Sequence, residues 1–463
     1  MSMQFSSIFS TQFNSAIPHP ELILIRHLKQ CLPDHQIVPT TAHDSSSFPL
    51  SAYLSSIGVE IELDPAHNDF EYNFDSSKDQ NKIWKNVVAG EMTFTYEGVP
   101  FRAFKVSWLQ DNSEHFFYGL TFVAQDDTVG QKLATEVYKH GDALKEEIWV
   151  YEGGRWRKSR QLYQAIRESK WDDVVLHDSF KEGLKRDTET FFSSKDVYRS
   201  LGITWKRGIL LLGPPGNGKT ESIKALLNEF EYEALYVKSF STPYGPEYGV
   251  RQIFDKARQH SPCILVLEDL DSMVTEKVRS FFLNEMDGLA QNDGMLTIAT
   301  TNHPERIDDA ILNRPSRFDV KYDFALPDED LRKEFARKWI GKIEKLSGRD
   351  VIFETDTEVL SRRVSEKTAG WTFAFLKELF VSFLLRIAHD SSLKHKGAKT
   401  NGTNGTTSPR NAGETLLNQI DVLSAQILRL KKAENVDDAD DADERWCPPL
   451  PESTGGVADG PTF

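Results

Sequence analysis

The sequence predicts an α/β fold in which a parallel sheet is preceded by a β-rich domain and followed by a helical subdomain. Three observations support this. Short apolar runs alternate with helical patterns in the middle of the chain. Aromatic and β-branched runs dominate from about Glu60 to Arg157. After Pro327 the apolar residues recur at helical spacing instead.

A chain of 463 residues exceeds the usual size of one hydrophobic core, so two or three domains are expected. We predict an N-terminal extension (1–59), a β-rich domain (60–165), an α/β core (166–326), a helical subdomain (327–390), a flexible linker (391–412), an amphipathic helix (413–435) and an acidic disordered tail (436–463).

The β-rich domain is predicted from three runs, Phe101–Trp108, His115–Val123 and Ile148–Tyr151. A helical stretch from Ser159 to Lys170 follows, and Trp171–Leu176 then leads into the core. We therefore expect the boundary between the two domains at about 158–170.

The core is predicted from apolar runs that have the length of buried strands. They occupy 209–212, 234–237, 263–267, 295–299 and 320–324. Helical patterns at 330–345, 356–368 and 372–388 then predict the helical subdomain.

The C-terminal part contains one more apolar seam, formed by Leu416, Ile420, Leu423, Ile427 and Leu430. Because isolated helices of this length are marginal, docking onto the chain's own helical subdomain is favoured over pairing with a partner helix. The segment 394–413 has almost no large apolar residues and is typical of a linker. The acidic run 436–444 predicts a solvated extension, with an interaction role as the alternative.

Residues 213–220 form a complete phosphate-binding loop between an apolar run and an amphipathic stretch. The loop consists of Gly213, Pro214, Pro215, Gly216, Asn217, Gly218, Lys219 and Thr220. Its glycines allow backbone N–H groups to turn toward phosphates, and the next helix presents its positive end. Lys219 can reach the β and γ phosphates, and the Thr220 hydroxyl can bind Mg²⁺. The alternative, a chance glycine-rich turn, leaves the strand and helix on either side unexplained.

Polar side chains follow two of the predicted strands. Glu268 and Asp269 come directly after 263–267, and Asn302 follows 295–299. One acid can hold Mg²⁺ and the other can orient or deprotonate a water that attacks the γ phosphate. Asn302 is a candidate contact to that phosphate or water. The alternative is a buried strand that is merely capped by acids.

Two arginines, Arg314 and Arg317, flank a Pro-Ser turn. A guanidinium supplied to a neighbouring subunit's γ phosphate would stabilise transition-state charge. The alternative is an ion pair within the chain, and the other motifs favour the role between subunits.

Composition narrows the classes of partner. A formal charge of −15 and a pI near 5.4 give no general attraction to nucleic acid or anionic lipid. Cys31, Cys263 and Cys447 are too far apart for a metal-binding spacing or a disulfide framework. No signal peptide or membrane span is predicted, so we expect an intracellular protein in the cytoplasm or nucleus.

Taken together, GPPGNGKT, ILVLEDLD, TIATTNHPERIDDAILNRPSRFD and FALPD resemble the AAA family of ring-forming ATPases, over roughly 170–390. The resemblance implies an ATPase domain with a helical lid, in a hexameric or other closed ring with Mg²⁺ and ATP bound between subunits. It assigns Lys219 and Thr220 to phosphate and Mg²⁺. It makes Glu268 and Asp269 the metal-binding and water-activating acids, Asn302 the sensor, and Arg314 and Arg317 the trans-acting fingers. Val174 and Val175 would lie near the adenine.

Within that family, the segment from Trp171 to Gly216 and the Glu-Asp order are most similar to the subgroup of the mitochondrial chaperone that assembles the Rieske iron–sulfur protein. That subgroup's membrane helix has no counterpart here, so its substrate and location are not transferred. The sequence also departs from the family pattern at Asp269, where glutamate is usual, at Ser316, where glycine is usual, and at Gly370–Ala374 in the lid.

The resemblance also implies an aromatic loop that grips polypeptide, and Tyr244 is the candidate. A tyrosine packed in a proline-kinked turn is the alternative. The leading hypothesis is therefore ATP-driven remodelling of an unidentified protein client selected by the β-rich domain. A nucleotide-controlled assembly scaffold with slow hydrolysis is the alternative. A nucleic-acid-handling ATPase ranks third, because it requires a basic channel.

Overall fold

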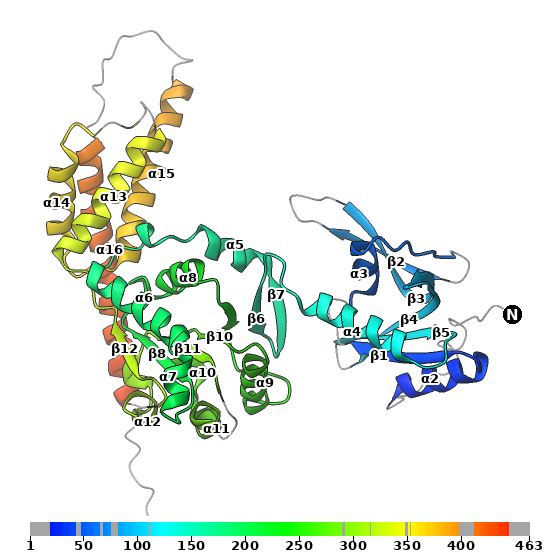
Figure 1. The fold of residues 1–463 in the computed structure, drawn as a ribbon. Coiled ribbons are helices and arrows are strands. Elements are labelled where there is room, and N and C mark those ends of the chain that lie inside the picture. Colours follow the sequence, from blue (N-terminus) through cyan, green and yellow to red (C-terminus); the bar gives the residue numbers. More distant parts are fainter. Residues whose placement is uncertain are drawn as a thin grey trace, which may run out of the picture. The chain divides into compact units, whose positions relative to one another are not determined.

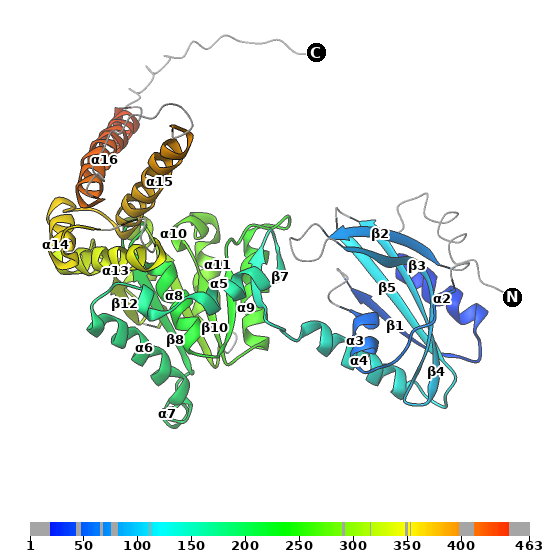
Figure 2. The same ribbon diagram turned by 90° about the horizontal axis from the view of Figure 1, so that it is seen from above.

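A computed structural model describes residues 19–42, 48–64, 68–75, 82–110, 113–288, 292–314, 316–347, 351, 353–397 and 412–443. The chain folds as two compact units, Met1–Lys145 and Glu146–Phe463. Figures 1 and 2 show the ribbon from two directions. Most of the predicted linker, 398–411, lies outside the described residues.

The first unit contains a five-stranded antiparallel sheet of order β1-β5-β4-β3-β2. Its strands are β1 (Gln36–Ala42), β2 (Asp69–Asp75), β3 (Lys82–Tyr96), β4 (Val99–Gln110) and β5 (Ser113–Phe122). Its helices are α2 (Pro20–Cys31), α3 (Leu50–Ser56) and α4 (Thr128–Asp142). Residues of α3 and α4 share one apolar cluster with Phe101 and Phe122, and α2 packs on Phe104 and Phe117.

The described part of the predicted N-terminal extension therefore belongs to this unit. Strand β1 pairs with β5 from Gln36↔Phe122 to Ala42↔Phe116. The sequence pattern did not indicate this pairing, because the two strands lie far apart in the chain. Separating residues 19–42 and 48–59 from the β-rich domain was wrong.

The second unit contains a seven-stranded sheet of order β12-β8-β11-β10-β9-β6-β7. Its strands are β6 (Ile148–Glu152), β7 (Arg155–Ser159), β8 (Lys206–Leu212), β9 (Glu233–Val237), β10 (Cys263–Leu267), β11 (Met295–Thr301) and β12 (Val320–Asp323). All neighbouring strands are parallel except the pair β6 and β7. The α/β core is confirmed, and each of the five runs predicted as core strands forms one of its strands.

Strands β6 and β7 correct the predicted domain boundary. Ile148–Tyr151 was assigned to the β-rich domain, but β6 pairs with β9 of the core, with Val150 opposite Tyr236. The two strands form a hairpin that extends the edge of the core sheet (Figure 1). Aromatic and β-branched composition indicates a strand but does not identify the sheet that the strand joins.

Helices surround the sheet of the core (Figure 2). They are α5 (Arg160–Glu168), α6 (Asp178–Ser193), α7 (Lys195–Ser200), α8 (Lys219–Glu229), α9 (Pro246–Gln259), α10 (Leu270–Met273), α11 (Glu276–Asp287) and α12 (Asp309–Leu312), with short 3₁₀ turns at Trp171–Asp173 and Pro304–Arg306. Residues of α5, α6 and α8 pack with Ile209, Val266 and Ile298 in one buried cluster. This packing fixes the ends of the core strands, where Glu268, Asp269 and Asn302 lie.

The helical subdomain consists of α13 (Glu329–Ser347), α14 (Thr357–Lys367), α15 (Phe373–Gly397) and α16 (Ala412–Asp443). Leu416, Ile420, Leu423 and Ile427 of α16 lie in the same buried cluster as the other three helices. The structure thus shows the amphipathic helix docked onto the chain's own helical subdomain, as predicted. Residues 436–443 of the predicted disordered tail are helical, and 444–463 lie outside the described residues.

No helix in the described part of the chain is both long enough and apolar enough to cross a membrane.

Candidate nucleotide site

The phosphate-binding loop connects the end of β8 to the start of α8 at Lys219. Gly213, Gly216 and Gly218 have φ values of 129°, 79° and 93°, which a side chain would strain. A Cβ at Gly216 would lie 2.6 Å from the Cβ of Ala374 in α15, so the loop lies directly against the helical subdomain. The glycines are needed for backbone conformation and, at Gly216, for this close approach.

Lys219 lies at the start of α8, where the loop ends, and is 6% exposed. Its Nζ donates hydrogen bonds to the carbonyl oxygens of Gly213, at 2.5 Å, and Pro214, at 2.9 Å. Burial lowers the pKa of the ammonium group, and the carboxylates of Asp269 and Asp271 oppose that change. The acids therefore favour a charged lysine at the position where a phosphate would be bound.

Thr220 and Glu268 meet across the site. The Thr220 hydroxyl donates a hydrogen bond of 2.7 Å to Oε1 of Glu268. A hydroxyl and a carboxylate are hard oxygen ligands of the kind that Mg²⁺ prefers, usually together with phosphate oxygens and water. The residues present therefore fit the metal that accompanies a nucleoside triphosphate.

Asp269 and Asn302 form a second pair, at the ends of the adjacent strands β10 and β11. The Asn302 carboxamide donates a hydrogen bond of 2.9 Å to Oδ1 of Asp269. Asp269 has a left-handed backbone, with a φ of 53°, and its N–H donates to Thr300 Oγ1 at 2.9 Å. Burial raises the pKa of the Asp269 carboxyl, and the neighbouring Glu268 and Asp271 raise it further. An acid held in this way is suited to orient or deprotonate a water.

Three residues that support the site were not singled out from the sequence, namely Thr300, Asp271 and Tyr236. Asp271 accepts hydrogen bonds from the Thr301 hydroxyl, at 2.7 Å, and from the Asn302 backbone N–H, at 3.3 Å, and so fixes the end of β11. Burial raises the pKa of the Tyr236 phenol, and Glu268 adds to that effect. A protonated phenol can donate to the carboxylate. The final acid of ILVLEDLD was a sequence signal for Asp271, whereas nothing local marked Tyr236 or Thr300.

A cavity of about 720 Å³ brings most of the predicted residues together. Its lining includes Pro215, Gly216, Gly218, Lys219, Thr220, Asp269, Asn302, Val174 and Val175. Glu268 reaches this site through Thr220. The helical subdomain contributes side chains that sequence reasoning missed, namely Phe335, Trp339, Lys342, Phe373, Ala374 and Lys377. The buried valines and these aromatic rings provide apolar surfaces that suit a purine base.

The two arginines differ in exposure. The Arg317 side chain is 5% exposed, and its Nε and Nη2 bond the two carboxylate oxygens of Asp287 at 2.9 and 2.8 Å. Its Nη1 donates to the Ala310 carbonyl. For Arg317 the structure shows the ion pair within the chain that the sequence left as the alternative, because the bidentate pair with Asp287 holds the guanidinium inside. Arg314 is 60% exposed and lies 3.4 Å from the same carboxylate.

Residues 209–326 match the family described as "ATPase family associated with various cellular activities (AAA)". This match identifies residues 209–326 as an AAA domain. It is 35% identical over 230 residues to the cell division cycle protein 48 homolog of Archaeoglobus fulgidus, covering 46% of this chain and 30% of that protein. It is 32% identical over 235 residues to Protein SAV of Sulfolobus acidocaldarius, covering 48% of this chain and 29% of that protein. The chain thus spans less than a third of the length of these relatives.

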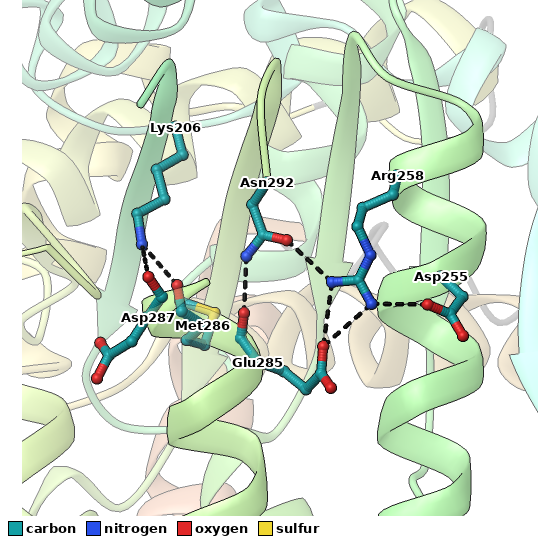
Figure 3. A network of polar contacts seen from close by, with 7 residues as sticks. All are labelled: Lys206, Asp255, Arg258, Glu285, Met286, Asp287 and Asn292. Carbon is teal, nitrogen blue, oxygen red and sulfur yellow. Dashed lines mark hydrogen bonds and ion pairs between the residues drawn. The ribbon is translucent and has the colours of Figure 1, made fainter. Parts of the chain in front are cut away.

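In the AAA domain, a polar network holds the C-terminal end of α11 in place (Figure 3). Lys206 donates to the carbonyl oxygens of Met286, at 2.7 Å, and Asp287, at 3.0 Å, and Asn292 donates to that of Glu285 at 2.7 Å. Arg258 of α9 bonds Asp255, Glu285 and Asn292. Lys206 and Asn292 bind carbonyls that a helix end leaves unpaired, and Arg258 holds the side chains of Glu285 and Asn292. Together these contacts fix the backbone that carries Asp287.

The loop after β9 of the AAA domain presents Tyr244, which is 73% exposed and contacts the ring of Tyr248 at a centroid distance of 5.3 Å. Thr242 organises this loop, because its hydroxyl donates to the Gly245 carbonyl at 2.7 Å and accepts from the Tyr244 N–H at 3.0 Å. The ring of Tyr244 therefore projects from an ordered turn into solvent.

Proposed function

We propose that this chain hydrolyses ATP at sites completed by neighbouring subunits of a ring, and that it uses the free energy to remodel polypeptides. The observation that supports the proposal best is the convergence of Lys219, the Thr220–Glu268 pair and the Asp269–Asn302 pair around one cavity.

Each pair has a role in the proposed reaction. Lys219 and the loop N–H groups bind the β and γ phosphates, and Thr220 with Glu268 holds the Mg²⁺ of the substrate. Asp269 orients the attacking water, takes its proton and is itself held by Asn302. The purine lies between the valines at 174 and 175 and the rings of the helical subdomain. This arrangement stabilises charge on the transferred phosphoryl group without covalent catalysis.

We infer the ring from the exposed position of Arg314. Its side chain is exposed, whereas the Arg317 side chain is bound within its own subunit. We assign Arg314 as the residue that reaches the γ phosphate of a neighbouring subunit. A contact of this kind joins two different surfaces, so it closes only as a ring, for which six subunits is our expectation.

The remodelling role rests on Tyr244, whose exposed ring can contact an extended polypeptide. The substrate of the Rieske-chaperone subgroup is not transferred to this chain, so the client stays unidentified. The first unit, with its separate sheet, is the element that we expect to select the client.

The first test is ATP hydrolysis by the purified chain over a wide range of protein concentration, with Lys219→Ala as the control for contaminating ATPase. Turnover per subunit should rise with concentration and should disappear in the control. Tight ATP binding with no Lys219-dependent turnover at any concentration would instead favour a nucleotide-controlled assembly scaffold.

Mixing two inactive variants tests the shared site directly. Arg314→Ala subunits keep their own phosphate loop, and Lys219→Ala subunits keep their arginine. Each variant alone should be inactive, and a mixture should recover turnover because one supplies the group that the other lacks. No recovery in mixtures that form hybrid rings by native mass spectrometry would rule out Arg314 as the shared residue.

A further inference from the structure

The β6–β7 hairpin contacts the turn that carries Tyr244. Its two-residue loop is Gly153-Gly154, with φ values of 60° and 80° at a turn closed by the pair Glu152↔Arg155. A Cβ at Gly154 would lie 3.1 Å from Cβ of Thr242 and 3.2 Å from Cδ of Pro243. A Cβ at Gly153 would meet nothing within 4 Å. One glycine of the turn thus lies against the Tyr244 loop and the other faces open space.

Thr242 is the residue that this contact reaches. Its Cβ faces Gly154, and its hydroxyl bonds the Tyr244 N–H and the Gly245 carbonyl. A displacement of Thr242 therefore changes the backbone on both sides of Tyr244. The hairpin and the exposed ring are linked through one side chain.

Further contacts fix the hairpin to the elements on either side of the loop. The Lys238 N–H donates to the Tyr151 carbonyl at 3.1 Å, and the Lys238 ammonium group lies 3.3 Å from Glu152. The Trp156 Nε1–H donates to the Gln252 carbonyl of α9 at 3.4 Å, and the Trp156 ring packs on Tyr151. Because β9 leads into the loop and α9 follows it, the hairpin holds both ends of the loop.

The position of the hairpin in the chain matters as well. The second unit begins at Glu146, and β6 begins at Ile148. The hairpin is therefore the first element of the second unit, and it contacts the Tyr244 loop.

We propose that the β6–β7 hairpin positions the Tyr244 loop through the contact of Gly154 with Thr242. This inference rests on the proposed function for the role of Tyr244, but the contact itself can be tested without it. Gly154 is a positioning residue and takes no part in hydrolysis.

The test compares Gly154→Ala with Gly153→Ala in the full-length chain. Both variants place a side chain at a left-handed position of the same turn, so both strain the hairpin similarly. Only Gly154→Ala places a methyl group against Thr242 and Pro243. The first readout is hydrogen exchange of the backbone amides of Ser241, Thr242, Tyr244 and Gly245. Thr242→Val is a positive control that removes the hydroxyl bonds.

Gly154→Ala should raise exchange in this loop by roughly fivefold relative to Gly153→Ala, because a displaced loop opens locally more often. The second readout is ATP turnover with and without casein, an unfolded polypeptide. Casein should stimulate turnover by the unmodified chain. Gly154→Ala should lose this stimulation and keep its Lys219-dependent basal turnover.

Equal exchange in the two glycine variants would overturn the inference, since turn strain alone would then explain any effect. Trp156→Phe provides a second route if Gly154→Ala does not fold, because it removes the bond to Gln252 and keeps an aromatic ring at this position. It should raise exchange at the same four amides, and no change there would also count against the inference. If basal turnover is absent from the unmodified chain, the proposed function fails, and the exchange comparison still decides the hairpin contact.

Discussion

The Asn302 carboxamide and the Asp269 carboxylate meet at a hydrogen bond of 2.9 Å, which joins the ends of β11 and β10 at the candidate nucleotide site. Aspartate is one methylene shorter than glutamate, the residue that is usual at this position in the AAA family. Asp269 has a left-handed backbone, with a φ of 53°, and its shorter side chain reaches Asn302. This pairing gives the short acid a defined orientation and makes its role testable.

Asp269→Asn should lower ATP turnover by roughly 10²-fold or more, the usual range for loss of a general base. Nucleotide affinity should change little, because Lys219 and the loop remain. Turnover and binding of a fluorescent ATP analogue measure the two effects separately. A variant that hydrolyses ATP at the normal rate would remove Asp269 from the mechanism.

The pH profile of turnover should have an acid limb set by Asp269. Its pKa is raised above the ordinary 3.8 chiefly by burial, and the base is active only when ionised, so turnover should fall as pH falls through the raised pKa. The bond from Asn302 lowers this pKa, so Asn302→Ala should move the midpoint to higher pH. A midpoint that stays the same or moves lower in Asn302→Ala would contradict this assignment.

Gly216→Ala should weaken ATP binding by roughly tenfold, equivalent to about 1.4 kcal/mol. The added Cβ would lie 2.6 Å from the Cβ of Ala374 and would separate the loop from α15. Adding Ala374→Gly to the same chain should restore part of the affinity, because it makes room for the methyl group. Calorimetry on the two single variants and the double variant gives the coupling energy. An additive result would mean that backbone strain alone causes the loss.

Asp287→Ala should lower the free energy of unfolding at neutral pH by about 3 kcal/mol, because it leaves the buried Arg317 guanidinium without its carboxylate. Arg314→Ala, at an exposed position, should change stability by less than about 0.5 kcal/mol. Denaturant unfolding measures both changes. Equal losses would contradict the different burial of the two arginines.

The contribution of Asp287 should also depend on pH. Arg317 lowers the folded-state pKa of this carboxyl below 3.8. The stabilisation is therefore fully present above pH 3.8, and it is lost as pH falls through the lower folded-state value. The stability difference between the unmodified chain and Asp287→Ala should be constant near neutral pH and should narrow in acid.

Ile420→Ala in α16 should destabilise the chain by about 2–4 kcal/mol, because the side chain is 1% exposed within the helical subdomain. Val422→Ala, at a 46% exposed position of the same helix, is the matched control and should cost less than about 0.5 kcal/mol. If both variants unfold at the same denaturant concentration as the unmodified chain, α16 is not part of the cooperative core.

Local sequence patterns predicted the parts of the fold and site that depend on neighbouring residues. The glycines at 213, 216 and 218 need a backbone that few other residues adopt, and the apolar runs before Glu268 and Asn302 have the length of buried strands. The carboxyl ends of parallel strands share one edge of a sheet, so polar residues that follow such strands lie near one another. The parallel sheet is confirmed, and the structure places these residues together.

Only the tertiary structure decided the features that depend on distant partners. The sequence by itself determined the phosphate loop, the positions of the core strands along the chain and the amphipathic character of α16. It did not determine that β6 pairs with β9, that β1 pairs with β5 or that Asp287 binds Arg317. The physical reason is that propensity and periodicity record the local backbone and the buried face of an element, whereas the choice of partner depends on packing between segments far apart in the chain.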